Sequence, residues 1–228
     1  MQPLDRRTAL KTAAAGATLA KLAGTAGAEQ TDAADAAVGH LGQTHDRVWL
    51  GGEFWANPME DWRVVDGAAE VQNGGGNRNV HLITRQVTNP DGSLAMSVRV
   101  KRVEAGNKDG GAGFRIGVRS DINEYRSNCF AGGGSPAGVI GGELALGPAR
   151  KKIDAPAKFD EFVLELSGKP TGDKYELTLT VKGTDGKELG TVSRTVASDA
   201  ILGNVSVVSN YDGSLKKGQG ARYAFTDW

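Results

Sequence analysis

The chain has 228 residues, of which 39% are hydrophobic and 24% charged, and it contains 33 glycines. This composition is typical of a globular protein with one main domain and many turns. Its 27 Lys and Arg residues balance 27 Asp and Glu residues, so the chain lacks the overall positive charge with which proteins hold nucleic acid. The single cysteine, Cys129, excludes an intramolecular disulfide and any metal site built from several cysteines.

Residues 1–28 have the pattern of a bacterial export signal. Arg6 and Arg7 precede a weakly apolar stretch, and the small-residue sequence AGA at 26–28 fits a cleavage site. Adjacent arginines are typical of the twin-arginine route, whose consensus the stretch resembles, with Ala9 as a mild departure at the first hydrophobic position. The alternative is an alanine-rich amphipathic helix. Such a helix would bury little, because its only large apolar side chains are leucines at 10, 19 and 22.

This pattern predicts the domain organisation. We expect a twin-arginine signal peptide at 1–28, a flexible polar tether at 29–46 and a folded domain at 47–228. The mature protein is then expected to be periplasmic or secreted. No apolar stretch approaches the ~20 residues of a membrane-spanning helix.

From Val48 onward, apolar and polar residues alternate as they do in half-buried strands. The clearest segments are 94–100, 113–119 and 175–181. In the second of these, Phe114, Ile116 and Val118 are expected to face inward and Arg115 and Arg119 outward. Further strands are expected at 62–65, 80–87, 124–130, 138–146, 162–167, 189–196, 204–210 and 222–228.

Turn residues separate these segments. Asp185-Gly186, within 181–192, is the best hairpin candidate, and other Asp-Gly pairs occur at 66–67, 91–92 and 212–213. Helix is expected only as a single turn near 197–202. Ten or more short strands with almost no helix predict an all-β protein with an antiparallel β-sandwich fold.

Three aromatic side chains, Phe54, Trp55 and Trp62, lie in a stretch that also carries Asn57 and two carboxylates, Glu60 and Asp61. Proteins hold sugar rings with this combination, because the aromatic face stacks on the apolar face of the ring while polar groups bind its hydroxyls. The alternative is that the aromatics cap one end of the sandwich, and we expect this for at least two of the three.

The glycine-rich stretch 73–82 lacks the lysine and the Ser or Thr of a phosphate-binding loop, and it precedes a strand rather than a helix. Asn77, Arg78, Asn79 and His81 are candidates for the lining of a polar groove. The alternative is a loop with a hydrogen-bonded structural histidine.

The stretch 122–142 places Arg126 and Asn128 on one face of an expected strand, beside a glycine loop. If Arg115 and Arg119 share that face, a concave sheet presents several guanidinium groups suited to carboxylates, phosphates or vicinal hydroxyls. Cys129 has no basic partner that would activate it, so a small buried residue is the preferred interpretation.

Catalytic signatures are otherwise missing. The histidines show no metal-binding spacing, and there is no G-x-S-x-G sequence. A carboxylate pair for glycoside hydrolysis stays open, with Glu143, Glu161 and Glu165 as the nearest candidates. No cofactor is expected. Whether a structural calcium ion binds among the aspartates at 91, 212 and 227 also stays open.

The leader together with GEFWANPMEDWRVVDG, GGGNRNVHLITRQ, GAGFRIGV and ARYAFTDW resembles the N-terminal region of exported bacterial alkaline phosphatase D-like proteins. The resemblance covers residues 6–228 and implies a sandwich similar to concanavalin A-like lectins and glucanases, followed by a metallophosphatase domain. The metal-ligand clusters of that domain do not occur in these 228 residues, so no phosphatase activity carries over. The chain is expected to be either the front part of a larger enzyme or a stand-alone module of the same ancestry.

The preferred hypothesis is therefore an exported, non-catalytic module that binds carbohydrate or another small polyhydroxyl or anionic ligand. The expected ligand-binding residues are Trp55, Arg78, Arg115, Arg126, Asn128 and Tyr211. Two alternatives stay open: a glycoside-active enzyme of the concanavalin A-like class, and a structural domain that packs on a catalytic partner.

Overall fold

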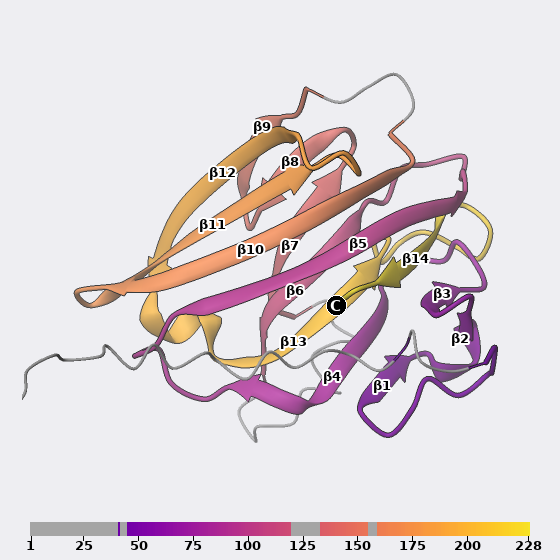
Figure 1. Cartoon of the computed structure of the whole chain (residues 1–228), viewed down its shortest axis with the longest axis horizontal. Helices are drawn as coiled ribbons and strands as arrows, with labels where there is room; N and C mark the ends of the chain where they lie inside the picture. Colours follow the sequence, from indigo (N-terminus) through magenta and orange to yellow (C-terminus); the bar gives the residue numbers. More distant parts are fainter. Residues whose placement is uncertain (1–40, 42–44, 120–132, 155–158) are drawn as a thin grey trace, which may run out of the picture. The chain divides into compact units, whose positions relative to one another are not determined.

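The structure is a computed structural model that describes Leu41 and residues 45–119, 133–154 and 159–228. These ranges contain strands β1 to β14 and the short 3₁₀ helices η2 (Met59–Asp61) and η3 (Ser198–Ile201). The strands form two seven-stranded sheets (Figure 1). The signal peptide expected at 1–28 lies outside the described residues. In the part of the chain that is described, no helix is long and apolar enough to cross a membrane.

Sheet I is the first of the two layers, and all its neighbouring strands are antiparallel. From edge to edge its order is β1 (Phe54–Asn57), β4 (Arg78–Val87), β13 (Gly203–Ser209), β6 (Ala112–Val118), β7 (Ser135–Ile140), β8 (Glu143–Leu146) and β9 (Ala149–Lys152).

Sheet II is the second layer and is also antiparallel throughout. Its order is β12 (Glu188–Ala197), β11 (Lys174–Lys182), β10 (Glu161–Thr171), β5 (Leu94–Glu104), β14 (Arg222–Thr226), β3 (Ala68–Val71) and β2 (Trp62–Val65). In Figure 1 the long strands β12, β11, β10 and β5 run side by side. The all-β fold of two antiparallel sheets is as expected from the alternating sequence.

The core lies between the sheets and is built by alternation along the strands. Successive side chains of a strand point to opposite faces, so every second residue enters the core. In β6 the inward residues are Phe114, Ile116 and Val118, all buried, as predicted. In β11 the buried set is Tyr175, Leu177, Leu179 and Val181. The residues between them on β11, such as Glu176 and Thr178, are partly exposed, whereas the outward Arg115 of β6 is buried.

Turn residues account for two predictions that were confirmed and one that was wrong. The hairpin at Asp185-Gly186 is confirmed: β11 and β12 pair across residues 183–187, with Gly186 at φ 80°. The single helical turn near 197–202 is confirmed as η3. The single strand expected at 138–146 is wrong, because Gly141 and Gly142, at φ 57° and 75°, turn the chain back and divide it into β7 and β8.

Strands β1, β3 and β9 were not expected. Each has only four residues, too few to establish an alternating pattern. The strand expected at 124–130 lies outside the described residues.

Two residues of the segment expected to be a tether (29–46), Leu41 and Asp46, contact the folded domain. Leu41 belongs to the core. The Asp46 carboxylate accepts a hydrogen bond from the Asp66 backbone N–H at 2.8 Å, and Arg47 forms an isolated antiparallel bridge with Val64 of β2.

Candidate ligand-binding face

One row of side chains crosses the outer face of sheet I, the face opposite the core. Strand pairing places Trp55 of β1 opposite His81 of β4, His81 opposite Ser206 of β13, Ser206 opposite Arg115 of β6 and Arg115 opposite Pro136 of β7. Directly opposed residues of antiparallel strands share a face. We call these five residues the cross-strand row. Adjacent strands are about 4.8 Å apart, so Trp55 and Arg115 are separated by roughly 14 Å across the sheet.

The row begins with an aromatic ring on an edge strand. Trp55 is partly exposed, and its ring lies 5.3 Å from the His81 ring, centroid to centroid, at an interplanar angle of 45°. Its neighbours along β1, Phe54 and Ala56, are buried in the core. As expected, two of the three aromatics of this stretch, Phe54 and Trp62, are core residues, and Trp55 alone of the three faces outward.

His81 is the second member of the row and is fully buried. Its Nδ1 lies 2.5 Å from Oδ1 of Asn204, and Nδ2 of Asn204 donates to the Leu82 carbonyl oxygen at 2.9 Å. Because Oδ1 of Asn204 is an acceptor in this arrangement, Nδ1 of His81 carries the proton. Burial lowers the pKa of His81 from 6.5 to about 4, with a smaller lowering contribution from the Arg115 charge. The imidazole is therefore neutral at physiological pH.

Ser206 occupies the centre of the row. Its hydroxyl is fully buried and has no hydrogen-bond partner in the part of the chain that the structure describes. An unsatisfied buried hydroxyl costs free energy and needs an explanation.

Arg115 is the fourth member of the row and is held in place by hydrogen bonds. It is only 3% exposed, and its Nη1 donates to Oδ1 of Asn77 at 2.6 Å and to Oδ1 of Asn79 at 3.2 Å. Nδ2 of Asn79 in turn donates to the Asn77 carbonyl oxygen at 2.7 Å. The sequence correctly predicted that Arg115 faces away from the core, but its guanidinium is buried among amides rather than solvated.

Tyr211 completes the wall beside Arg115. The guanidinium carbon of Arg115 lies 6.0 Å from the Tyr211 ring centroid, within cation–π range. The Tyr211 hydroxyl donates to the Phe114 carbonyl oxygen at 2.8 Å. Burial raises the pKa of this phenol, although the Arg115 charge acts in the opposite direction. Gly138 makes room for the tyrosine, since a Cβ there would lie 2.5 Å from the hydroxyl oxygen.

The structure thus brings together three of the six expected site residues on this face, Trp55, Arg115 and Tyr211. Arg78 lies on the same strand as His81 but at a position of opposite parity, and its Nε pairs with Oδ2 of Asp61 at 2.7 Å. Arg126 and Asn128 lie outside the described residues. Arg119 does not join Arg115; it pairs with Asp199 at 3.0 Å.

Two contributors to the face, Asn204 and Ser206, were not predicted from the sequence. Both belong to the segment expected to be a strand at 204–210, in which polar residues alternate with Val205 and Val207. That alternation predicts one polar face, but the pairing partners of β13 come from β4 and β6, more than 80 residues away. The alternative expectation for His81 was a hydrogen-bonded structural histidine, and its contact with Asn204 agrees with that expectation.

The candidate carboxylates do not converge. Glu161 and Glu165 are four positions apart on β10, about 13 Å along a strand, whereas glycosidase carboxyl groups lie roughly 5–9.5 Å apart. Glu161 pairs with Arg99 at 3.2 Å and Glu165 with Lys182 at 2.7 Å. Glu143 belongs to the other sheet. None of these pairings supports a hydrolytic pair.

The described ranges contain no cluster of three or more His, Cys, Asp or Glu side chains arranged to hold a metal ion. Asp212 accepts hydrogen bonds from the backbone and hydroxyl of Ser214, and Asp227 pairs with Arg99 at 3.2 Å. A structural calcium site stays a prediction.

Several solved structures resemble the chain in fold. Lectin II from Ulex europaeus matches at 15% identity over 80% of this chain and 97% of that chain, with a TM-score of 0.41. Arcelin-5, a lectin-like defence protein from Phaseolus vulgaris, matches at 11% identity over 79% and 96%, with a TM-score of 0.41. A Lotus tetragonolobus seed lectin matches at 13% identity over 77% and 86%, also with a TM-score of 0.41.

At these scores no residue and no ligand is transferred from those proteins, and the fold assignment rests on the two sheets themselves. No protein-family model matches the chain, and no curated protein matches it in sequence.

Proposed function

We propose that this protein is a binding module for carbohydrate or another small polyhydroxyl or anionic ligand, and that the ligand contacts the Trp55 end of the outer face of sheet I. The observation that carries this proposal is the cross-strand row. A partly exposed indole begins the row, and an imidazole, a hydroxyl and a guanidinium follow it on adjacent strands.

The chemistry of the row suits a sugar. The indole offers an apolar face for a pyranose ring, and it is partly exposed on the edge strand β1. The groups beyond it are held by the bonds of Asn204, Asn77 and Asn79, so little side-chain entropy is lost when they bind a ligand. His81 and Ser206 are fully buried in this structure, so a ligand reaches them only after a local rearrangement.

The six expected residues take different roles in this proposal. Trp55 contacts the ligand directly, whereas the guanidinium of Arg115, which is buried like His81 and Ser206, reaches it only after the same local rearrangement. Arg126 and Asn128 belong to the connection between β6 and β7, two neighbouring strands of the same sheet, and we propose them as further contacts. Tyr211 and Arg78 are positioning residues, because the hydroxyl of Tyr211 and the guanidinium of Arg78 are already engaged with the protein.

A glycan array tests the proposal. The wild-type chain is compared with Trp55→Ala, Arg126→Ala and the matched control Trp49→Ala, which removes a tryptophan that is 57% exposed and lies outside the row. We expect loss of about 1 kcal/mol of stacking, or about five-fold weaker binding, in Trp55→Ala and wild-type binding in Trp49→Ala. Wild-type binding by Trp55→Ala, or loss only in Trp49→Ala, would contradict the site.

The proposal also covers how the protein is exported and which domain it accompanies. We propose that residues 1–28 direct the folded chain through the twin-arginine pathway, and that the sandwich serves as an accessory module beside a phosphoesterase domain of the alkaline phosphatase D-like class. Support comes from the leader pattern and from the sequence resemblance alone.

A further inference from the structure

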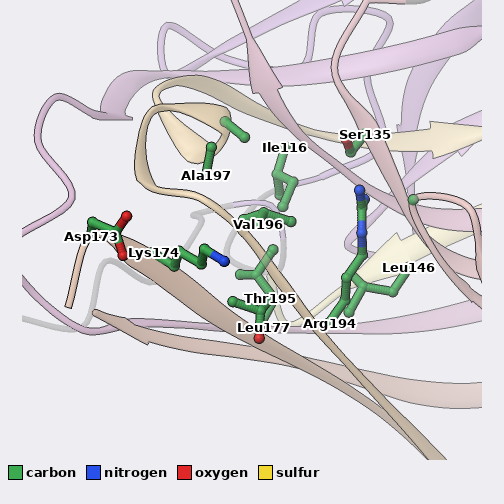
Figure 2. A pocket seen from close by; sticks show the side chains of 12 residues that line it. Ile116, Ser135, Leu146, Asp173, Lys174, Leu177, Arg194, Thr195, Val196 and Ala197 are labelled. Atoms are coloured by element: carbon green, nitrogen blue, oxygen red, sulfur yellow. The ribbon is translucent and has the colours of Figure 1, made fainter. Parts of the chain in front are cut away.

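A pocket of about 510 Å³ opens between the two sheets, on the core side of sheet I rather than on the outer face that carries the cross-strand row (Figure 2). Its lining comes from β6, β7 and β8 of sheet I, from β11 and β12 of sheet II, and from η3. Pockets of this volume hold small organic molecules.

The floor of the pocket is apolar. Ile116, Leu146 and Leu177 are core residues that each present part of their side chain to it. Val196 adds a half-buried aliphatic surface. This floor suits the carbon skeleton of a ligand rather than a bare inorganic ion.

Arg194 enters this apolar space from β12. It is paired in register with Leu177, so both side chains point toward the interior of the sandwich. Val192 and Val196, two positions before and after it on the same face, pack against the core. Arginine therefore occupies a position at which the alternation of the strand would otherwise supply an aliphatic side chain.

The opposite wall has space for this guanidinium. Gly147 follows β8, is buried, and has φ 59°. A Cβ at this position would collide with Nη1 of Arg194. Any larger residue would displace the guanidinium from the pocket.

The pocket carries a net positive charge that the described residues do not neutralise. Arg194 and Lys174 form neither a hydrogen bond nor an ion pair through their side chains with any described residue, and Asp173, the one carboxylate of the lining, lies outside ion-pair distance of both. In Figure 2 Lys174 extends toward Thr195 and Val196, and Arg194 points toward Ser135. A half-buried guanidinium with five unused donors favours an oxyanion partner.

We propose that this pocket binds a small organic oxyanion, a carboxylate or phosphate ester with a compact carbon skeleton. Arg194 binds the oxyanion in a bidentate manner, and the hydroxyl of Ser135 provides a further hydrogen bond. Lys174, paired in register with Ala197 of β12, supplies a second positive charge to the pocket lining.

Fluorescence titration with 8-anilinonaphthalene-1-sulfonate tests the site, since this probe combines a sulfonate with an aromatic body. N-phenyl-1-naphthylamine, which lacks the sulfonate, is the matched neutral probe. We expect the anionic probe to bind the wild-type chain and to bind Arg194→Leu at least ten-fold more weakly, with partial recovery in Arg194→Lys. The control Arg63→Leu removes an exposed arginine of β2 and should bind like the wild type.

Competition then separates the sources of the oxyanion. Glucuronate and citrate represent carboxylates, glucose 6-phosphate represents phosphate esters, and glucose is the uncharged control. Displacement of the probe by one of the three acids but not by glucose supports the proposal. Equal probe binding by the wild-type and Arg194→Leu chains, displacement by glucose, or displacement by none of the acids overturns it.

Discussion

The buried His81 imidazole makes the stability of the fold depend on pH in a way that the structure specifies. Its pKa is about 4 in the folded protein and about 6.5 in an unfolded chain. Between these values the unfolded chain binds the proton and the folded chain does not, so the free energy of unfolding falls as the pH falls from about 6.5 toward 4. Above pH 6.5 the contribution is fully present.

The expected size follows from the two pKa values. Lowering the pH from about 7.5 to about 5 protonates His81 almost completely in the unfolded chain and very little in the folded one, which removes about 2 kcal/mol of stability. The physical cause is burial of the ring, reinforced by the neighbouring Arg115 charge. The Nδ1 contact with Asn204 opposes the shift but does not cancel it.

Urea unfolding of the wild-type chain and of His81→Gln at both pH values measures this contribution. Glutamine keeps an amide donor for Asn204 but does not titrate, and the acidic groups common to both proteins cancel in the comparison. We expect the loss of stability between the two pH values to be about 2 kcal/mol smaller in the variant. NMR titration of the His81 ring checks the same point in the folded wild-type chain.

Equal pH dependence in the two proteins, or an imidazole that titrates near 6.5 in the folded state, would refute the reasoning. Either result would mean that water reaches the His81 ring in the folded protein.

Three other predictions concern a close contact at Gly138, the interior charge of Arg194 and the arginine pair of the leader. Gly138→Ala should lower stability by about 2 kcal/mol, because its Cβ would collide with the Ala112 carbonyl oxygen and the Tyr211 hydroxyl. Gly92→Ala has open space and should change stability by less than about 0.5 kcal/mol, and urea unfolding distinguishes the two variants. Arg194→Leu should raise stability by about 1 kcal/mol in thermal unfolding, since an unpaired interior charge is replaced by an aliphatic side chain; a lower melting temperature would contradict this. Replacing both arginines at 6 and 7 with lysine should leave the chain in the cytoplasm of a host with an active twin-arginine pathway, as cell fractionation would show.

The sequence predicted the β-sandwich because most strands alternate strictly. Leu94 to Val100 and Tyr175 to Val181 each place every second residue in the core, and this period is independent of the rest of the chain. Prediction failed where strands were too short to show a period, as in β1 and β9. It also failed at Gly141-Gly142, a turn inside an apolar run.

The candidate face was harder to predict, because it depends on which strands become neighbours. The sequence indicates that Arg115 faces outward, but not that Ser206 and His81 lie beside it, since their pairing joins segments far apart in the chain. Burial of the Arg115 guanidinium is likewise a property of the assembled sheet. The Arg194 pocket was missed for the same reason: its opposite wall, Gly147, belongs to the other sheet.

The central claim, ligand binding at the Trp55 end of the row, is tested most directly by two-dimensional NMR of the four tryptophan indoles during titration with the strongest glycan from the array. Assignment uses Trp55→Phe. We expect the Trp55 indole N–H resonance to shift with ligand concentration, while the resonance of the core residue Trp62 stays in place. A bound glycan that leaves the Trp55 resonance unchanged, or an array on which no glycan binds, would contradict the claim.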